Sequence, residues 1–373
     1  MKFWVYIVAM ILVGGFLEIR AFPIHLDTNV WYVKEGFSIS YTNTGKQNLK
    51  DFHKKEATPI LPQDFPIFLN NPSQIEMTIL TYFTLSEYSN SLPLGFFIPT
   101  IGENWQVYLN EKLIAEEMHL SENKEIKKSR YVFGKLISFD SSLLRSGENI
   151  LCIRILGNPD IPFTGLSAKS GYEISILEVL QKEKSDEVIL VLSFLYLFIG
   201  LYHLLLYTKR KTDQQYLFFG LFSLLICLYI FFRSNRIYGY PIDSYLLTRL
   251  EYCLAYTLAP LQIAFLESLF YKKISFLIKG YSIVCGLLFL ITMVVPMEYT
   301  IYFLRTWQVS ILLFAFYCGY LLVNAVKRKV STARTISIGF IFLAIASITD
   351  ILDSIFFKTR IQFLQTGFFI YIR

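Results

Sequence analysis

Charged residues are scarce in this 373-residue chain: lysine, arginine, aspartate and glutamate together make up 17% of it, whereas hydrophobic residues make up 54%. Charged residues normally make up about 25% of a soluble domain. The mean hydropathy of +0.46 points the same way. The net charge of +6 comes without a basic helix or an aromatic-rich basic strip, which argues against a nucleic-acid partner. The composition therefore favours a membrane protein.

Cysteine and histidine are also few. Cys152 is the one cysteine in the polar part of the chain, which therefore holds no internal disulfide; the other cysteines lie in apolar segments, at Cys227, Cys253, Cys285 and Cys318. No Cys/His spacing predicts a metal site or a cofactor. No nucleophile–base set or Gly-rich phosphate loop occurs, and no catalytic context surrounds the histidines, His25, His53, His119 and His203. The sequence predicts that this chain is not an enzyme.

Apolar sequence is abundant after Glu187. Seven segments are candidates for membrane-spanning helices, and the last is incomplete: residues 187–207, 215–233, 245–271, 276–295, 300–326, 335–357 and 361–373. A helix needs about 20 mostly apolar residues to span a bilayer. We expect residues 187–373 to form an α-helical transmembrane bundle surrounded by membrane lipid.

Basic residues fill the gaps on one side of this series. They lie in the gaps 208–214, 272–279 and 327–334, as Lys209, Arg210, Lys211, Lys272, Lys273, Lys279, Lys327, Arg328, Lys329 and Arg334. The gaps near 238–243 and 296–299 hold none. Because basic loops stay in the cytoplasm, the polar part before Glu187 is predicted to lie outside. The exceptions are Lys358–Arg360, in a gap that should face outside, and Arg233 and Arg236, near an outer boundary.

Residues 1–22 are predicted to be a signal peptide or an uncleaved N-terminal anchor. Lys2 precedes a short apolar run, Phe3–Phe16, and the small residue Ala21 follows. Ile19 stands where a small residue is usual, so the uncleaved anchor stays open. Both alternatives deliver the next segment to the outside of the membrane.

Residues 25–182 are expected to form a β-sandwich outside the membrane. Between Ile75 and Leu85 apolar and polar residues alternate, which is the period of a strand with one buried face. Further strands are predicted at Leu94–Ile98, Trp105–Leu109, Lys112–Ala115, Ile150–Leu156 and Tyr172–Ile176. Asn110–Glu111 is expected to be a turn. Ile150–Leu156 is expected to be central in a sheet, because it is apolar on both faces.

The segment Trp105–Lys112, the corner Leu143–Leu151 with its Gly-Glu-Asn, and Arg154 together resemble the galactose-binding-like jelly roll. That fold includes sugar-binding domains of glycoside hydrolases, so the resemblance implies a carbohydrate or another small-molecule ligand. Trp31 and Trp105 are candidate ligand-binding residues, because an aromatic face suits the C–H surface of a sugar. Packing in the core is the alternative for both. The Gly-Glu-Asn corner is expected to be a turn.

Polar side chains inside the apolar segments are candidates for function, because burying them in a bilayer is unfavourable. The sequence singles out His203, Asp350 and Asp353. The two aspartates share one helix face and are expected to accept hydrogen bonds from neighbouring helices; alternatively, they order the bundle or reach the outer headgroups. Arg249 and Glu251 do not face each other and are expected to be solvated near the outer surface.

The block Gly200–Tyr207, Arg210–Asp213 and Tyr216–Phe222 resembles the start of the bacterial seven-transmembrane receptors with diverse intracellular signalling modules. The order of signal sequence, jelly roll and helices fits as well. The resemblance implies a sensor in the bacterial inner membrane, whose periplasmic domain acts through the helices on a cytoplasmic kinase, cyclase or phosphatase. This chain shows no such output motif.

We therefore expect the receptor to continue beyond Arg373. Ile361–Ile372 would reach about 18 Å as a helix, against a hydrocarbon core of about 30 Å. A last segment lying on the outer surface, with six spans, is the alternative. Two other functions stay open: a transporter, for which Pro260 is the clearest helix break, and an anchored carbohydrate-binding module. The short charged join Lys182–Glu187 favours the receptor, and a homodimer is an open alternative.

The charge pattern predicts which loops lie in the cytoplasm. In a background without native cysteines, Lys211→Cys and Lys329→Cys should resist membrane-impermeant thiol reagents in intact cells, because both sit in basic loops. Ser121→Cys in the polar domain should react. Equal labelling of all three would refute the topology.

Overall fold

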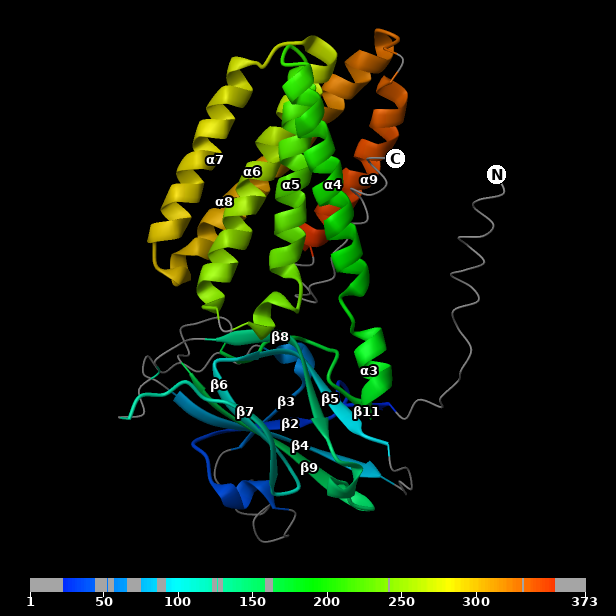
Figure 1. The fold of residues 1–373 in the computed structure, drawn as a ribbon. Helices are drawn as coiled ribbons and strands as arrows, with labels where there is room; N and C mark the ends of the chain where they lie inside the picture. Colours follow the sequence, from blue (N-terminus) through cyan, green and yellow to red (C-terminus); the bar gives the residue numbers. More distant parts are fainter. Residues whose placement is uncertain are drawn as a thin grey trace, which may run out of the picture.

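The computed structural model describes residues 23–43, 52, 57–65, 75–85, 92–122, 126, 130–157, 164–240, 242–330 and 332–352. A β-sandwich comes first in the chain, and a bundle of long helices stands on one end of it (Figure 1). The predicted signal segment 1–22, Asp353 and the segment 361–373 lie outside the described residues.

The sandwich consists of two antiparallel sheets. The larger has the strand order β3 (Thr58–Ile60), β2 (Trp31–Glu35), β4 (Ile75–Leu85), β9 (Gly147–Gly157), β6 (Asn104–Leu109) and β7 (Lys112–Glu117). In the smaller sheet, β5 (Leu94–Gly102) pairs with β11 (Glu173–Ile176), β8 (Tyr131–Phe139) and β10 (Gly165–Leu166), and β1 (Ile24–His25) pairs with β11. The β-sandwich and the strands named from the sequence are confirmed; β1, β2, β3, β8 and β10 were not predicted.

Strand β9 is central, as expected. It pairs with β4 from Ile75↔Gly157 to Leu85↔Gly147 and with β6 on its other side. Its inner face carries Leu151, Ile153 and Ile155 into the main core between the sheets. Its outer face carries Ile150 and Cys152 into a second, smaller cluster with Phe52, Leu80 and Tyr108. Burial on both sides explains why the strand is apolar on both faces.

Two asparagines join the turns at one end of the larger sheet. Asn110 and Glu111 both have positive φ (46° and 76°), as the two central residues of a type I′ hairpin require. Asn110 Nδ2 donates to Asn149 Oδ1 (2.7 Å), and the Ile150 N–H donates to Asn110 Oδ1 (2.9 Å). Asn149 Nδ2 donates to the Arg145 carbonyl (2.8 Å). The turn expected at Gly-Glu-Asn is wrong, because Gly147, Glu148 and Asn149 are the first residues of β9 and pair with β4.

The sandwich leads into the bundle through a short helix, α3 (Leu177–Glu183). The long helices follow in order: α4 (Glu187–Lys209), α5 (Gln214–Arg233), α6 (Ser244–Tyr271), α7 (Phe276–Val294), α8 (Met297–Lys327) and α9 (Ala333–Leu352). Six helical segments in the described part of the chain are long and apolar enough to cross a membrane. These bounds agree with the first six predicted segments.

Two features of the bundle concern a close helix contact and a proline inside a helix. Helices α4 and α5 approach closely at two glycines: a Cβ on Gly200 would lie 2.7 Å from Leu224 Cγ and 3.0 Å from the Gly220 carbonyl oxygen. Larger residues there would force the helices apart. The break expected at Pro260 is wrong, because α6 continues through it as one helix.

Candidate functional site

Strand β8 of the sandwich is hydrogen-bonded to the beginning of α6. Tyr131 Oη donates to the Ser244 carbonyl (3.0 Å), and Ser244 Oγ donates to the Tyr131 carbonyl (2.9 Å). Tyr131 Oη also contacts Thr248 Oγ1 one turn further along α6. All three residues are buried. A reciprocal pair of this kind fixes the position of α6 against the strand.

The turn between α5 and α6 packs against the same strand. It contains a 3-10 helix, η4 (Ile237–Gly239), whose Ile237 and Tyr238 belong to the main core of the sandwich. Arg130 Nη2 donates to the Tyr238 carbonyl (2.7 Å), and Arg130 Nη1 pairs with Glu117 Oε1 (2.8 Å). The hydrophobic core therefore runs from the sandwich into the helix ends without interruption.

Two further contacts widen this interface. Tyr245 Oη on α6 donates to the buried carboxylate of Glu103 (2.6 Å). Asp186, just before α4, accepts the N–H groups of Asn235 (2.5 Å) and Arg236 (3.2 Å). The first contact ties α6 to the sandwich, and the second ties the start of α4 to the α5–α6 turn.

Glycine at position 134 of β8 permits this close approach. Its φ is +60°, a value that favours glycine. A Cβ there would lie 2.6 Å from Asn235 Cγ, which is too close for carbon atoms. Any larger side chain there must displace the side chain of Asn235 on the α5–α6 turn.

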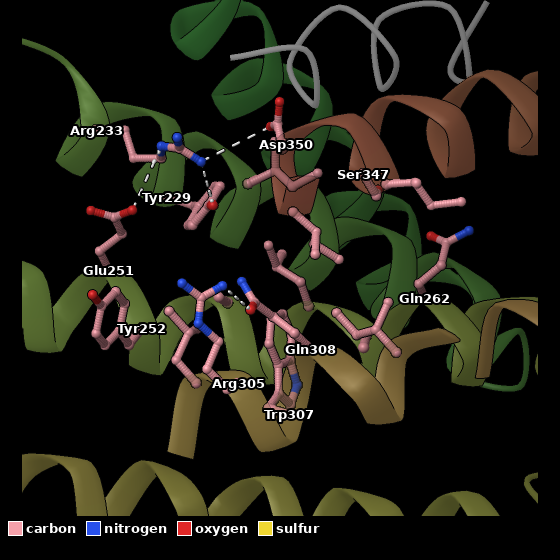
Figure 2. A pocket seen from close by; sticks show the side chains of 18 of the residues that line it. Tyr229, Arg233, Glu251, Tyr252, Gln262, Arg305, Trp307, Gln308, Ser347 and Asp350 are labelled. Carbon is pink, nitrogen blue, oxygen red and sulfur yellow. Dashed lines mark hydrogen bonds and ion pairs between the residues drawn. The ribbon is translucent and has the colours of Figure 1, made fainter. Parts of the chain in front are cut away.

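On the bundle side of this interface, a buried arginine joins three helices. Figure 2 shows Arg233 of α5 between Glu251 of α6 and Asp350 of α9. The Arg233 Nε–Glu251 Oε1 distance is 3.6 Å, and the Nη1–Asp350 Oδ2 distance is 4.0 Å. Arg233 Nη1 also donates to Tyr229 Oη (2.8 Å). Each of the three charged residues exposes less than a tenth of its surface.

A cavity of about 370 Å³ adjoins these charges, between α5, α6, α8 and α9. The arginine cluster, which consists of Arg233, Glu251 and Asp350, lines one part of it (Figure 2). Arg305 and Gln308 of α8 face it as well, and Arg305 Nη1 donates to Gln308 Oε1 (3.2 Å). Apolar side chains line the rest, among them Leu258, Ile263, Cys318, Phe340 and Leu343. Thr100, Phe133 and Ser167 of the sandwich also line it. The cavity thus touches both parts of the protein.

Buried polar contacts also occur at the other end of the bundle. Glu267 on α6 accepts hydrogen bonds from Tyr317 Oη of α8 (2.6 Å) and from the Ser275 N–H (2.7 Å). Ser275 caps the first turn of α7. This carboxylate therefore holds α6, α7 and α8 together away from the sandwich.

Of the intramembrane polar residues predicted from the sequence, Asp350 lies in the arginine cluster, and Asp353 lies outside the described residues. His203 stands apart: its Nδ1 is 2.9 Å from the Ile199 carbonyl oxygen of its own helix, and its ring packs on Phe219. The expectation that Glu251 is solvated is wrong, because Arg233 draws it into the bundle. Arg249 bonds the Thr292 carbonyl (2.6 Å).

The two candidate sugar-stacking tryptophans lie in the core of the sandwich. Neither Trp31 nor Trp105 has any exposed surface. The Trp31 indole N–H donates to the Leu26 carbonyl (3.1 Å), and its ring packs against Phe65 and Tyr172. Neither indole presents a face to solvent, so the alternative role in packing describes their position.

The remaining groups to consider are possible metal ligands and the cysteine thiol of the sandwich. Within the described ranges, no group of three histidine, cysteine, aspartate or glutamate side chains could hold a metal ion. Burial raises the pKa of the Cys152 thiol, which keeps it in its unreactive protonated form.

These features define a multi-pass membrane protein whose helix ends are built into a folded β-domain. Residues 188–372 match the profile of the family described as 7TM diverse intracellular signalling, and the chain belongs to this family through its helical part. The protein is therefore a transmembrane receptor of the sensor type.

Solved structures offer weaker likenesses. A β-glucuronidase from Ruminococcus gnavus is 15% identical with a TM-score of 0.29, over 42% of this chain and 30% of that chain. The enzyme from Bifidobacterium dentium is 17% identical with a TM-score of 0.25, over 36% and 20%. The enzyme from Faecalibacterium prausnitzii is 15% identical with a TM-score of 0.24, over 35% and 21%. Less than a third of each enzyme is covered. No protein with a curated description matches the chain.

Replacing the central arginine should strongly destabilise the bundle. Arg233→Met leaves Glu251 and Asp350 buried without their cation, which costs about 3–5 kcal/mol. Thermal unfolding of the detergent-solubilised protein should show a clear fall in Tm. Arg236→Met, three residues along and exposed, is the control and should leave Tm unchanged. Adding Glu251→Gln and Asp350→Asn to Arg233→Met should recover much of the loss; equal Tm values for both arginine variants would contradict the assignment.

Proposed function

We propose that this chain is the sensing part of a receptor in the bacterial inner membrane. The sandwich lies in the periplasm and binds a small-molecule or carbohydrate ligand, and the helices carry the change to a cytoplasmic output domain. The chain itself acts as a sensor rather than as an enzyme. The alternation of basic and non-basic loops supports the orientation.

The observation that carries the proposal is the buried contact between β8 and the start of α6. Tyr131 and Ser244 exchange three hydrogen bonds there, and the core of the sandwich includes Tyr238 of the α5–α6 turn. A flexible tether would absorb a movement of the sandwich. A hydrogen-bonded, close-packed joint passes it on, because packed interfaces shift between discrete arrangements. A carbohydrate-binding module that only needs anchoring has no use for such a joint.

A ligand acts through this joint only if it binds two arrangements of the sandwich with different affinity. A movement of β8 displaces the α5–α6 turn. Arg233 ends α5, one residue before the turn begins, so the same displacement alters its distances to Glu251 and Asp350. The route from sandwich to bundle is therefore short.

For the ligand, a surface hollow on the sandwich is a better candidate than the buried tryptophans. It has a volume of about 410 Å³ and is lined by Asn29, Tyr32 and Tyr82 together with Ile24, Val30, Phe83 and Thr84. The rings of Tyr32 and Tyr82 meet edge to face at 6.0 Å. Aromatic faces beside an amide and a hydroxyl are groups that suit a sugar.

Transmission of a movement from the sandwich to the helices can be tested without a ligand, by a substitution that disturbs the contact between β8 and the α5–α6 turn. Gly134→Ala places a methyl group against the end of the Asn235 side chain, so this side chain of the α5–α6 turn must move. Helix displacements of about 1–2 Å are typical of such switches. Spin labels on Lys211→Cys and Lys329→Cys, read by pulsed EPR in nanodiscs, should report a changed distance or distribution.

The matched control is Gly36→Ala. Gly36 also has a positive φ, +77°, but a Cβ there meets nothing within 4 Å. It imposes the same backbone strain without contact with the helices and should leave the label distance as in the parent. Identical distributions for both alanine variants would count against a mechanical link.

Ligand binding by the sandwich has its own test. Tyr32→Ala removes one aromatic face of the hollow and should weaken the best glycan hit on an array several-fold, as expected for about 1 kcal/mol. Tyr240→Ala, in the exposed α5–α6 turn, is the control. Unchanged binding in Tyr32→Ala would exclude this hollow as the ligand site.

A further inference from the structure

We infer that the cavity inside the bundle is a second ligand site, which takes an uncharged amphipathic molecule from the lipid phase. It is distinct from any periplasmic ligand site on the sandwich. The inference concerns binding and does not depend on the proposed output. The argument uses the size of the cavity, the chemistry of its two ends and the helices that enclose it.

The size of the cavity fits a small organic molecule. Ligand sites usually have volumes of about 300–1,000 Å³. At about 30 Å³ for each water-sized group, 370 Å³ hold at least about twelve heavy atoms. A medium-length alkyl or prenyl chain with a small polar group has that size.

The polar end of the cavity selects against a charged molecule. The described lining contains two guanidinium groups, Arg233 and Arg305, and two carboxylates, Glu251 and Asp350. These charges balance, so a ligand with a net charge would enter the low-dielectric interior without compensation. An uncharged group such as a hydroxyl or carbonyl can exchange hydrogen bonds with Thr248 or Gln308 nearby.

The remaining wall is apolar and reaches the lipid-facing surface. Ile263 and Leu343 are buried in it, and they offer an apolar chain the same contacts as a protein core. Leu312 of α8 and Ile348 of α9 line the cavity and are 43% and 40% exposed. The lining between α8 and α9 thus continues into the surface that faces lipid, which makes the membrane the source of the ligand.

The position of the cavity would make its occupant a regulator. Phe133 of β8 lines it, and β8 is the strand that bonds α6. A molecule there touches the sandwich, the arginine cluster and α8 at once. Its binding favours whichever arrangement of the joint leaves room for it.

The test is photolabelling of the full chain in lipid nanodiscs with a diazirine derivative of decan-1-ol. Tryptic mapping should place the label on α6, α8 or α9 at residues that line the cavity. Unlabelled decan-1-ol should compete. Decyl sulfate and decyltrimethylammonium, compared at equal concentration in the bilayer, should compete at least about tenfold less, because they carry permanent charge.

Filling the cavity gives an independent check. Ala259→Phe and Ala344→Phe each add a ring inside the lining and should reduce labelling about tenfold. Val309→Phe adds a ring on the lipid-facing side of α8, where Val309 is 65% exposed, and should leave labelling unchanged. Thermal unfolding identifies any variant that does not fold, and the competition experiment on the parent needs no variant.

Three results would overturn the inference: labels spread over lipid-facing residues only, equal or stronger competition by either charged amphiphile, or full labelling in both folded, filled variants. Absence of any specific label would be a fourth result that overturns it. None of these results affects the Gly134→Ala experiment, so failure of this inference is distinguishable from failure of the receptor proposal.

Discussion

The helical bundle depends on one buried positive charge, the guanidinium group of Arg233. Arg233 lies between Glu251 and Asp350, and it draws α5, α6 and α9 together because none of these charges is tolerated alone in an apolar interior. Hydrophobic packing gives little preference between helices in a bilayer, where lipid is as apolar as leucine. A directional ion-pair cluster supplies the missing preference and fixes which helix faces meet.

The same stretch of chain serves both the membrane and the sandwich. Arg233 ends α5, η4 enters the core of the sandwich, and Ser244 begins α6 against Tyr131. Between Arg233 and Glu251, the chain passes from the ionic cluster to the β-domain and returns to the cluster. The sandwich therefore packs directly against the end of the bundle. Figure 1 shows β8 at the end of the sandwich that meets the helices.

Periodicity was enough to predict β4, β6, β7 and β9 of the larger sheet and the spans, since alternation in β4 and long apolar runs report burial directly. It missed β8, where Gly134 and Lys135 interrupt the pattern because the strand meets the α5–α6 turn instead of solvent. Both tryptophans were plausible on a surface, because a sequence does not say which face of a strand is covered. Arg233 was noticed as an exception to the charge pattern, but its partners come from distant helices and only the fold brings them together.

The distance in sequence between Tyr131 and Ser244 has a consequence for biogenesis. Their hydrogen bonds join residues 113 positions apart, across two helices that enter the membrane after the sandwich has been synthesised. Domains generally fold as units, with the N-terminal one first. The sandwich is thus synthesised before the helix ends that it packs against. Its docking is a late step, which requires correct insertion of α4, α5 and α6. A receptor with an inverted or skipped helix would display an undocked sandwich with Tyr131 and Phe133 uncovered, a surface that quality-control proteases and chaperones recognise.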